Sequence, residues 1–257
     1  MVAESRLDVV EDALIALRGY IARPPQGGHV VLLFSGGIDS VVAAAQLAET
    51  RAGRLHLLFV NRSQTNLVGE LESARYYADL LREKYGDGVP ALSVVTSSIP
   101  SPELRLSIQP YSQAYGYPCR DNLFALAGME YLVSLPPDGL SKRHVYLASL
   151  DEDRYPHCSL LALRATTLTA CVSTPFDDWC VTSPHADQLI APFGVQTKAS
   201  VISWARDRGI PLARTRTCQS GLLENCGACE LCLKRQAAFQ KAGVADDTAY
   251  ANEPVDL

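Results

Sequence analysis

Short apolar runs alternate along the chain with segments whose apolar residues recur every three or four positions. The runs are typical of buried strands, and they cover residues 29–34, 55–60, 91–95 and 144–149, with a further short strand beginning at 189–191. The periodic segments are typical of helices, and they cover residues 39–50, 67–85, 123–135, 160–172 and 198–207. Strands that alternate with helices favour a parallel sheet with helices on its faces. We therefore predict an α/β fold.

Several segments fall outside this alternation. Helical spacing near the N-terminus predicts an amphipathic packing helix, shown by Leu7, Val10, Leu14, Leu17 and Ile21. Residues 97–118, rich in proline and glycine, are expected to form an irregular insertion, and 173–187 a loop. We expect three parts: a helix and linker over 1–28, the α/β domain over 29–210, and a cysteine-rich segment over 211–257.

Composition narrows the class of protein. Apolar residues make up 47% and charged residues 20%, as in ordinary globular proteins. No apolar run reaches the ~18 residues that span a bilayer, and acids within the N-terminal helix argue against a secretory signal. A net charge of −5 without a basic run makes direct nucleic-acid binding unexpected. Eight cysteines without such a signal suggest a reducing compartment, so we expect a cytoplasmic protein.

A glycine pair joins the first predicted strand to the helix that follows, in the sequence Ser35-Gly36-Gly37-Ile38-Asp39-Ser40. Glycine lets a ligand approach the backbone closely, and a helix N-terminus presents N–H groups and a positive dipole end. The joint therefore suits a phosphate or pyrophosphate group. Its spacing matches neither a Walker A loop nor a dinucleotide-binding fingerprint.

Four cysteines near the C-terminus have the spacing of a metal site: Cys218, Cys226, Cys229 and Cys232. Two overlapping Cys-x-x-Cys steps fold around one ion, and a fourth thiolate completes a tetrahedron without an open position. We expect a structural zinc ion, with an iron–sulfur cluster as the alternative. Among the other cysteines, Cys119 and Cys158 lie in loops, and the sequence shows no base paired with either.

The loop resembles the Ser-Gly-Gly-x-Asp-Ser signature of the ATP-pyrophosphatase (PP-loop) superfamily, which has a Rossmann-like fold. Loop and cysteine tail together resemble the 7-cyano-7-deazaguanine synthase family of queuosine biosynthesis over roughly residues 29 to 240. The resemblance implies a ligase that activates 7-carboxy-7-deazaguanine with ATP and magnesium, releasing AMP and pyrophosphate. Ammonia then gives an amide and a nitrile. It also implies a zinc-containing homodimer.

The resemblance implies roles for individual residues. Ser35, Gly36, Gly37, Ile38 and Ser40 would hold the nucleotide phosphates, with Asp39 positioning the magnesium-bound nucleotide. Gln64 and Glu70 match a segment after the second strand, and Gln64 would contact the nucleotide. Arg120 and Lys198 would act in catalysis, and Pro192 matches the segment before Lys198.

The substrate loop departs from the family pattern Gly-Tyr-Pro-Asp-Cys-Arg. This chain has Arg154-Tyr155-Pro156-His157-Cys158-Ser159, so His157 replaces an acid and Ser159 replaces an arginine. Tyr155 offers a flat face for an aromatic ring, and His157 a hydrogen bond or a base for an incoming amine. We expect Tyr155, His157 and Arg120 to bind the substrate, with a replacement acid from 151–153.

Two other functions stay open. One is a ligase that joins a deazapurine-type acid to an amine on a protein or small molecule, in the setting of a bacterial antiviral defence cluster. The other is a catalytically inactive nucleotide-binding partner protein. The complete loop from Ser35 to Ser40 weighs against inactivity, because a degenerate binder has less need to keep every element.

Overall fold

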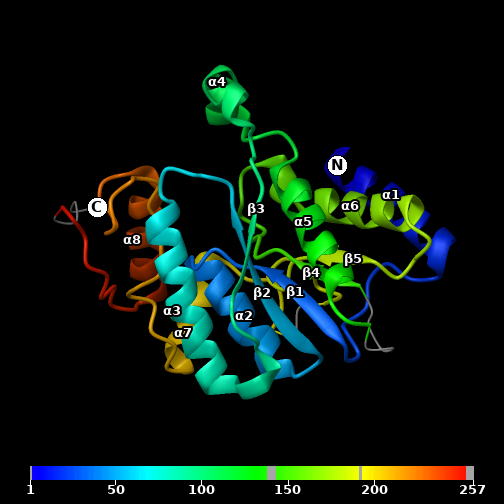
Figure 1. The fold of residues 1–257 in the computed structure, drawn as a ribbon, viewed down its shortest axis with the longest axis horizontal. Helices are drawn as coiled ribbons and strands as arrows, with labels where there is room; N and C mark the ends of the chain where they lie inside the picture. The colour runs from blue at the N-terminus through cyan, green and yellow to red at the C-terminus, as the bar shows by residue number, and fades with distance from the viewer. Residues whose placement is uncertain (1, 138–142, 191–192, 253–257) are drawn as a thin grey trace.

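The computed structural model describes residues 2–137, 143–190 and 193–252, with side chains from residue 6 onward. Its centre is a five-stranded parallel sheet in the order β3-β2-β1-β4-β5 (Figure 1). The strands are β1 (His29–Leu33), β2 (Arg54–Asn61), β3 (Ser93–Thr96), β4 (His144–Tyr146) and β5 (Cys180–Thr182). The predicted α/β fold with a parallel sheet is confirmed.

Helices cover both faces of the sheet, and alternate residues of β1 explain why. Val30 and Leu32 belong to one apolar cluster, whereas Val31 belongs to the other. The first cluster packs under α2 (Ile38–Thr50), α3 (Leu67–Tyr85), α7 (Lys198–Asp207) and α8 (Glu230–Ala242). The second packs under α5 (Arg120–Ser134) and α6 (Leu160–Ser173), and α1 (Val2–Arg18) lies against α6. A strand buried on both faces has a continuous run of apolar residues, as seen from Val30 to Leu33 in β1.

The order of the strands creates a crevice at the carboxyl ends of the two neighbouring strands β1 and β4. From β1 the chain passes to β2 and β3 on one side, and it returns to β4 and β5 on the other. The loops that follow β1 and β4 therefore diverge at the carboxyl ends of two neighbouring strands. Open parallel sheets bind ligands at such a switch point.

Two segments differ from their predictions. Residues 97–118, expected to be irregular, contain a short 3-10 helix (Pro102–Leu104) and α4 (Arg105–Tyr115), which projects away from the sheet (Figure 1). The sequence did not predict this helix because Pro110 inside it argues for a break, and none of its residues is buried. The predicted loop over 173–187 contains β5, whose three residues are too few to show a period.

Smaller differences concern the ends of elements. Strand β4 stops at Tyr146, three residues before the predicted end. Residues 188–190 form a turn instead of the expected strand start, and Ala191 lies outside the described residues, as does Pro192. Helix α8 was not predicted, because cysteine ligand spacing dominates the sequence at its start.

The longest helix, α3, has 19 residues and carries charged side chains along its length. Among the residues that the structure describes, no helix has both the length and the apolar character needed to cross a membrane. The expected cytoplasmic location stays a prediction.

Candidate functional site

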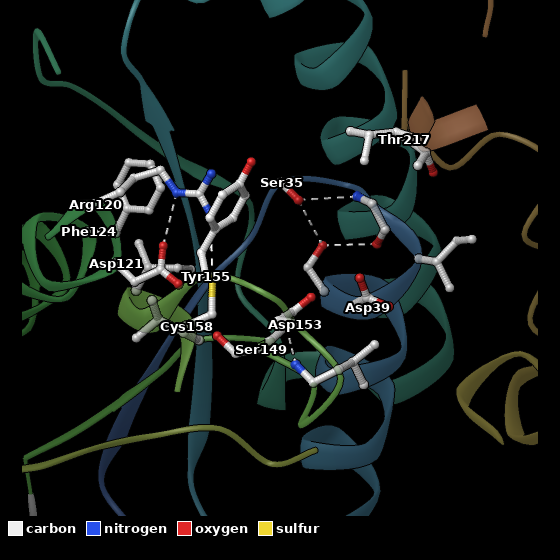
Figure 2. A pocket seen from close by; sticks show the side chains of 18 of the residues that line it. Ser35, Asp39, Arg120, Asp121, Phe124, Ser149, Asp153, Tyr155, Cys158 and Thr217 are labelled. Atoms are coloured by element: carbon white, nitrogen blue, oxygen red, sulfur yellow. Dashed lines mark hydrogen bonds and ion pairs between the residues drawn. The ribbon is translucent and has the colours of Figure 1, made fainter. Parts of the chain in front are cut away.

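A cavity of about 1040 Å³ opens at the carboxyl ends of β1, β2 and β4. Its walls come from the loop after β1, the end of β2, the start of α5, the loop after β4, and the starts of α7 and α8. Figure 2 shows Ser35 and Asp39 on one side of it and Arg120 and Phe124 on the other. We call the first side the loop end and the second the arginine end.

The loop end is built by hydrogen bonds within the Ser-Gly-Gly turn. The Ser35 Oγ accepts from the Gly37 N–H at 3.3 Å, and the Ser40 Oγ donates to the Gly37 carbonyl at 3.0 Å. Gly37 is the N-cap of α2 and supplies no side-chain cap. The N-terminal N–H groups of α2 therefore lack such a cap beside the cavity, an arrangement that suits an anion. Ser35, Gly37, Ile38 and Ser40 all line the cavity.

Gly36, predicted to contact phosphate, is not among the lining residues and faces α3 instead. Its carbonyl accepts from the Ser73 Oγ at 2.7 Å and from the Arg216 N–H at 3.1 Å. Its φ is +75°, and a Cβ there would lie 2.5 Å from the Ala74 nitrogen. Glycine is required here because the loop crosses directly against the backbone of α3.

We expect Gly36→Ala to lower the free energy of unfolding by about 3 kcal/mol, because the new methyl group meets backbone that cannot yield. Gly243→Ala is the matched control. Its φ is +64° in the left-handed region, and nothing lies within 4 Å of the added Cβ, so only backbone strain of about 1 kcal/mol applies. Urea unfolding of both variants measures the difference. Equal losses would show that the contact with α3 is not tight.

Asp39 and Lys198 meet at the loop end, although they are distant in sequence. The Lys198 Nζ forms an ion pair with the Asp39 Oδ2. The Asp39 Oδ1 is buried and has no hydrogen-bond partner. The Lys198 N–H donates to the Glu152 Oε1 at 2.8 Å, which fixes the start of α7 beside the loop. An unpartnered carboxylate oxygen of this kind fits a magnesium ion bound together with phosphate.

The buried His185 forms a hydrogen bond with the backbone of Asp39. Its Nε2 lies 2.9 Å from the Asp39 carbonyl, and its Nδ1 lies 3.2 Å from the Gln196 side chain. Gln196 in turn contacts Gln46 in α2 at 2.9 Å. Burial lowers the pKa of His185, so the neutral ring donates from Nε2 at neutral pH. The sequence analysis did not find His185, because no motif links it to residue 39.

Arg120 forms the arginine end at the start of α5. Its Nε donates to the Asp121 Oδ1 at 3.0 Å, and its Nη2 lies 3.8 Å from the Cys158 Sγ. Burial by itself would raise the pKa of Asp121, but the His157 hydrogen bond and the Arg120 charge outweigh it and lower that pKa. Asp121 therefore stays ionised and holds the guanidinium at the cavity wall.

His157 lies behind the cavity wall instead of lining it. The side chain is buried, and its Nδ1 lies 3.3 Å from the Asp121 Oδ1. Its ring stacks on Tyr155 with centroids 5.6 Å apart, and Tyr155 does line the cavity. The Arg154 guanidinium also lies 4.6 Å from the centroid of the Tyr155 ring. The structure thus gives His157 a supporting position that the sequence pattern did not indicate.

Cys158 contacts the His157 Nδ1 at 3.3 Å, which superficially resembles a cysteine–histidine pair. Burial, and then the charge of Asp121, raise the pKa of Cys158 far above its ordinary range. The thiol is therefore protonated at neutral pH and is a poor nucleophile. Cys119 is exposed at the N-cap of α5.

Of the three acids in the 151–153 turn, Glu152 and Asp153 line the cavity, whereas Asp151 does not. The Asp153 Oδ2 accepts from the Leu150 N–H at 2.9 Å. Limited hydration in the cavity raises the pKa of Asp153, and the nearby Asp39 raises it further.

Gln64, which also lines the cavity, donates to the Glu70 Oε2. Arg62 is a lining residue that the sequence analysis missed, although a polar residue directly after a parallel strand is a usable signal.

The four predicted cysteine ligands come together beside this cavity. Their sulfur atoms all lie within 4.8 Å of one another, with 3.8 Å from Cys218 to Cys229 and 3.9 Å from Cys226 to Cys232. A tetrahedral ion with metal–sulfur bonds of about 2.3 Å requires sulfur–sulfur edges of about 3.8 Å. The cluster could therefore hold a single metal ion.

Comparisons with known proteins agree with these features. Residues 111–243, more than half of the chain, match the protein family described as "Queuosine biosynthesis protein QueC". A 7-cyano-7-deazaguanine synthase from Methanosphaerula palustris is 27% identical over 235 residues, which cover 86% of this chain and 98% of that protein. The 7-cyano-7-deazaguanine synthase 2 of Desulfitobacterium hafniense is 27% identical over 229 residues, which cover 87% of this chain and 93% of that protein.

Among solved structures, a protein described as a predicted subunit of tRNA methyltransferase from Methanocaldococcus jannaschii aligns with a TM-score of 0.42. It is 15% identical, and the alignment covers 73% of this chain and 91% of that one. A similarity of this size carries no argument about function. The family match spans Arg120, Lys198 and all four clustered cysteines, and it confirms the resemblance drawn from the sequence motifs. The chain belongs to the QueC family of queuosine biosynthesis proteins.

Proposed function

We propose that this protein is an ATP-dependent ligase that adenylates a flat heteroaromatic carboxylic acid and then passes the acyl group to ammonia. The observation that supports this most directly is that one cavity joins an anion-binding helix N-terminus to an arginine-lined wall with an aromatic ring. The first candidate acid is 7-carboxy-7-deazaguanine, because the curated relatives carry the name 7-cyano-7-deazaguanine synthase.

At the loop end, Ser35, Gly37, Ile38 and Ser40 bind the phosphates through the turn and the N-terminus of α2. The unpartnered Asp39 Oδ1 would hold magnesium, which would shield the phosphate charge when bound. A carboxylate oxygen of the acid attacks the α-phosphorus, the new C(O)–O–P bond forms, and the bond to pyrophosphate breaks. Lys198 lies where its ammonium stabilises negative charge that develops in this step.

At the arginine end, Arg120 orients the carboxylate and Tyr155 supports the ring. Asp153 faces the same cavity, and a carboxylate there accepts N–H groups of a purine-like ring. Of the three acids in the 151–153 turn, we propose Asp153 as the replacement for the acid of the family pattern, which is His157 in this chain. His157 acts through Tyr155 and Asp121 instead of touching the acid.

The four-cysteine cluster holds zinc in this proposal, as a structural ion. Sulfur–sulfur distances of 3.8 and 3.9 Å suit one tetrahedral ion. An iron–sulfur cluster would need space for several iron and sulfide atoms between the same sulfurs. The homodimer that the family resemblance implies stays a prediction.

A ligase with a larger amine acceptor is the second candidate, and one feature favours it. Gln109 and Gln113 of the projecting α4 line the cavity, while α4 has no buried residue. A larger acceptor would find an open surface beside the reacting acid. The complete loop from Ser35 to Ser40, with Asp39 paired to Lys198 of α7, weighs against an inactive partner protein.

The test is pyrophosphate release from ATP and magnesium, with and without 7-carboxy-7-deazaguanine. We expect release that depends on the acid, with AMP as the nucleotide product, followed by an amide or nitrile in the mass spectrum when ammonia is present. An adenylate that accumulates until a larger amine is added would favour the second candidate. ADP and phosphate as sole products, or no dependence on any heteroaromatic acid, would contradict the proposal.

A further inference from the structure

Arg62 has a backbone that is held firmly at the rim of the cavity. It follows directly after β2, whose last residue is Asn61. Its N–H donates to the Gln64 Oε1 at 3.1 Å, and its carbonyl accepts from the Arg105 Nη2 at 3.1 Å. Arg62 is among the residues that line the cavity, as are Arg120 and Glu70, whose charges act on it. A fixed backbone limits where the guanidinium can go, so its presence at the wall is not incidental.

This guanidinium has no direct carboxylate partner. Within the part of the chain that the structure describes, no carboxylate forms an ion pair with it. Glu70 acts on it only through space, because the two Glu70 oxygens accept from Gln64 and from the Asn66 Nδ2. Burial lowers the pKa of Arg62, and the positive charges of Arg120 and Arg105 lower it further. A guanidinium remains protonated nevertheless.

Arg120 differs because Asp121 already neutralises it. Its Nε donates to the Asp121 Oδ1, and Arg120 also lines the cavity. Of the two guanidinium groups, Arg120 therefore has a directly bonded carboxylate and Arg62 does not. A half-buried positive charge of this kind is stabilised when a ligand supplies an anion.

We infer that Arg62 binds the carboxylate of the acid substrate together with Arg120, and that it distinguishes the acid from uncharged analogues. This inference rests on the proposed function. Guanidinium groups match the planar carboxylate through paired hydrogen bonds, which an amide or nitrile cannot accept in the same way. The phosphates have their own site at the N-terminus of α2, beside Asp39 and Lys198. Loss of the negative charge at the end of the reaction would also weaken product binding.

The test compares Arg62→Gln and Arg62→Lys with the wild type by equilibrium binding. The ligands are 7-carboxy-7-deazaguanine, its neutral 7-amido analogue, and magnesium ATP. We expect Arg62→Gln to weaken binding of the acid by about 10- to 100-fold, while affinity for the amide and for ATP changes by less than about threefold. Arg62→Lys should recover part of the loss, because it restores charge without the fork geometry.

Arg82→Gln is the matched control, since Arg82 is an exposed arginine near the end of α3 and does not line the cavity. It should bind all three ligands as the wild type does. Unchanged acid affinity in Arg62→Gln, or weaker ATP binding instead, would overturn the inference alone. Wild-type protein that does not bind the acid would overturn the proposed function and this inference with it. Thermal melting and retained ATP affinity show whether each variant is folded.

Discussion

Asp39→Asn is expected to reduce turnover by about 100-fold or more, the scale on which single electrostatic contacts to a reacting group act. The substitution keeps the size of the side chain and removes its charge. It leaves Lys198 without its ion pair, and it removes the unpartnered carboxylate oxygen that suits magnesium. Both side chains are partly exposed, Lys198 by 24% and Asp39 by 26%. The loss of this ion pair should therefore cost at most about 1 kcal/mol of stability.

Steady-state pyrophosphate release at several magnesium concentrations measures this effect. We expect both a lower kcat and a higher requirement for magnesium. Asp207→Asn is the control, because within the described part of the chain Asp207 pairs with its exposed neighbour Arg206 in α7. It should behave as the wild type. An Asp39→Asn variant with normal turnover would show that this carboxylate does not act on the nucleotide.

Cys229→Ala is expected to release the bound metal and to lower the free energy of unfolding by more than about 4 kcal/mol, because the binding energy of such a site is folding energy. Cys229 is the N-cap of α8, and Cys232 lies in its first turn. Glu230, Leu231 and Lys234 of the same turns line the cavity. Loss of the ion should therefore disorder one wall of the cavity as well.

Elemental analysis of the purified variant and its thermal melting curve measure the two effects. Cys119→Ala is the control, since Cys119 is exposed and lies outside the cluster. It should keep one ion per chain. Full metal content in Cys229→Ala, or wild-type protein that contains neither zinc nor iron, would reject the assignment of these ligands.

Local signals in the sequence predicted much of this fold. The bounds of α3 and α7 match the predicted ranges, because each helix has an apolar face with a clear period. Helix α4 was missed because Pro110 lies inside it, and proline and glycine in residues 97–118 predicted irregular structure. Strand β5 was missed because it owes its place to pairing with β4 across the sheet. The predicted division into three parts stays a prediction.

In the site, too, the sequence revealed residues that are close along the chain but not those that only folding brings together. Motif spacing identified the loop from Ser35 to Ser40 and the four cysteines, since those residues are close in sequence. His185 and Arg216 hold the loop from 146 or more residues away, and only the folded chain brings them there. The structure places Gly36 and His157 in contact with α3 and Asp121, which residue type alone did not indicate, and their ligand contacts stay predictions.

Helix α4 contributes to the cavity without contributing to the hydrophobic core. It stands outside both apolar clusters, and β1 pairs with β4 without any contribution from it. Insertions, deletions and substitutions there would leave the hydrophobic core intact. The same helix forms part of the cavity rim through Gln109, Ser112 and Gln113. Evolution can therefore adjust the size of molecule that reaches the cavity while the loop from Ser35 to Ser40 and the arginine end are left unaltered.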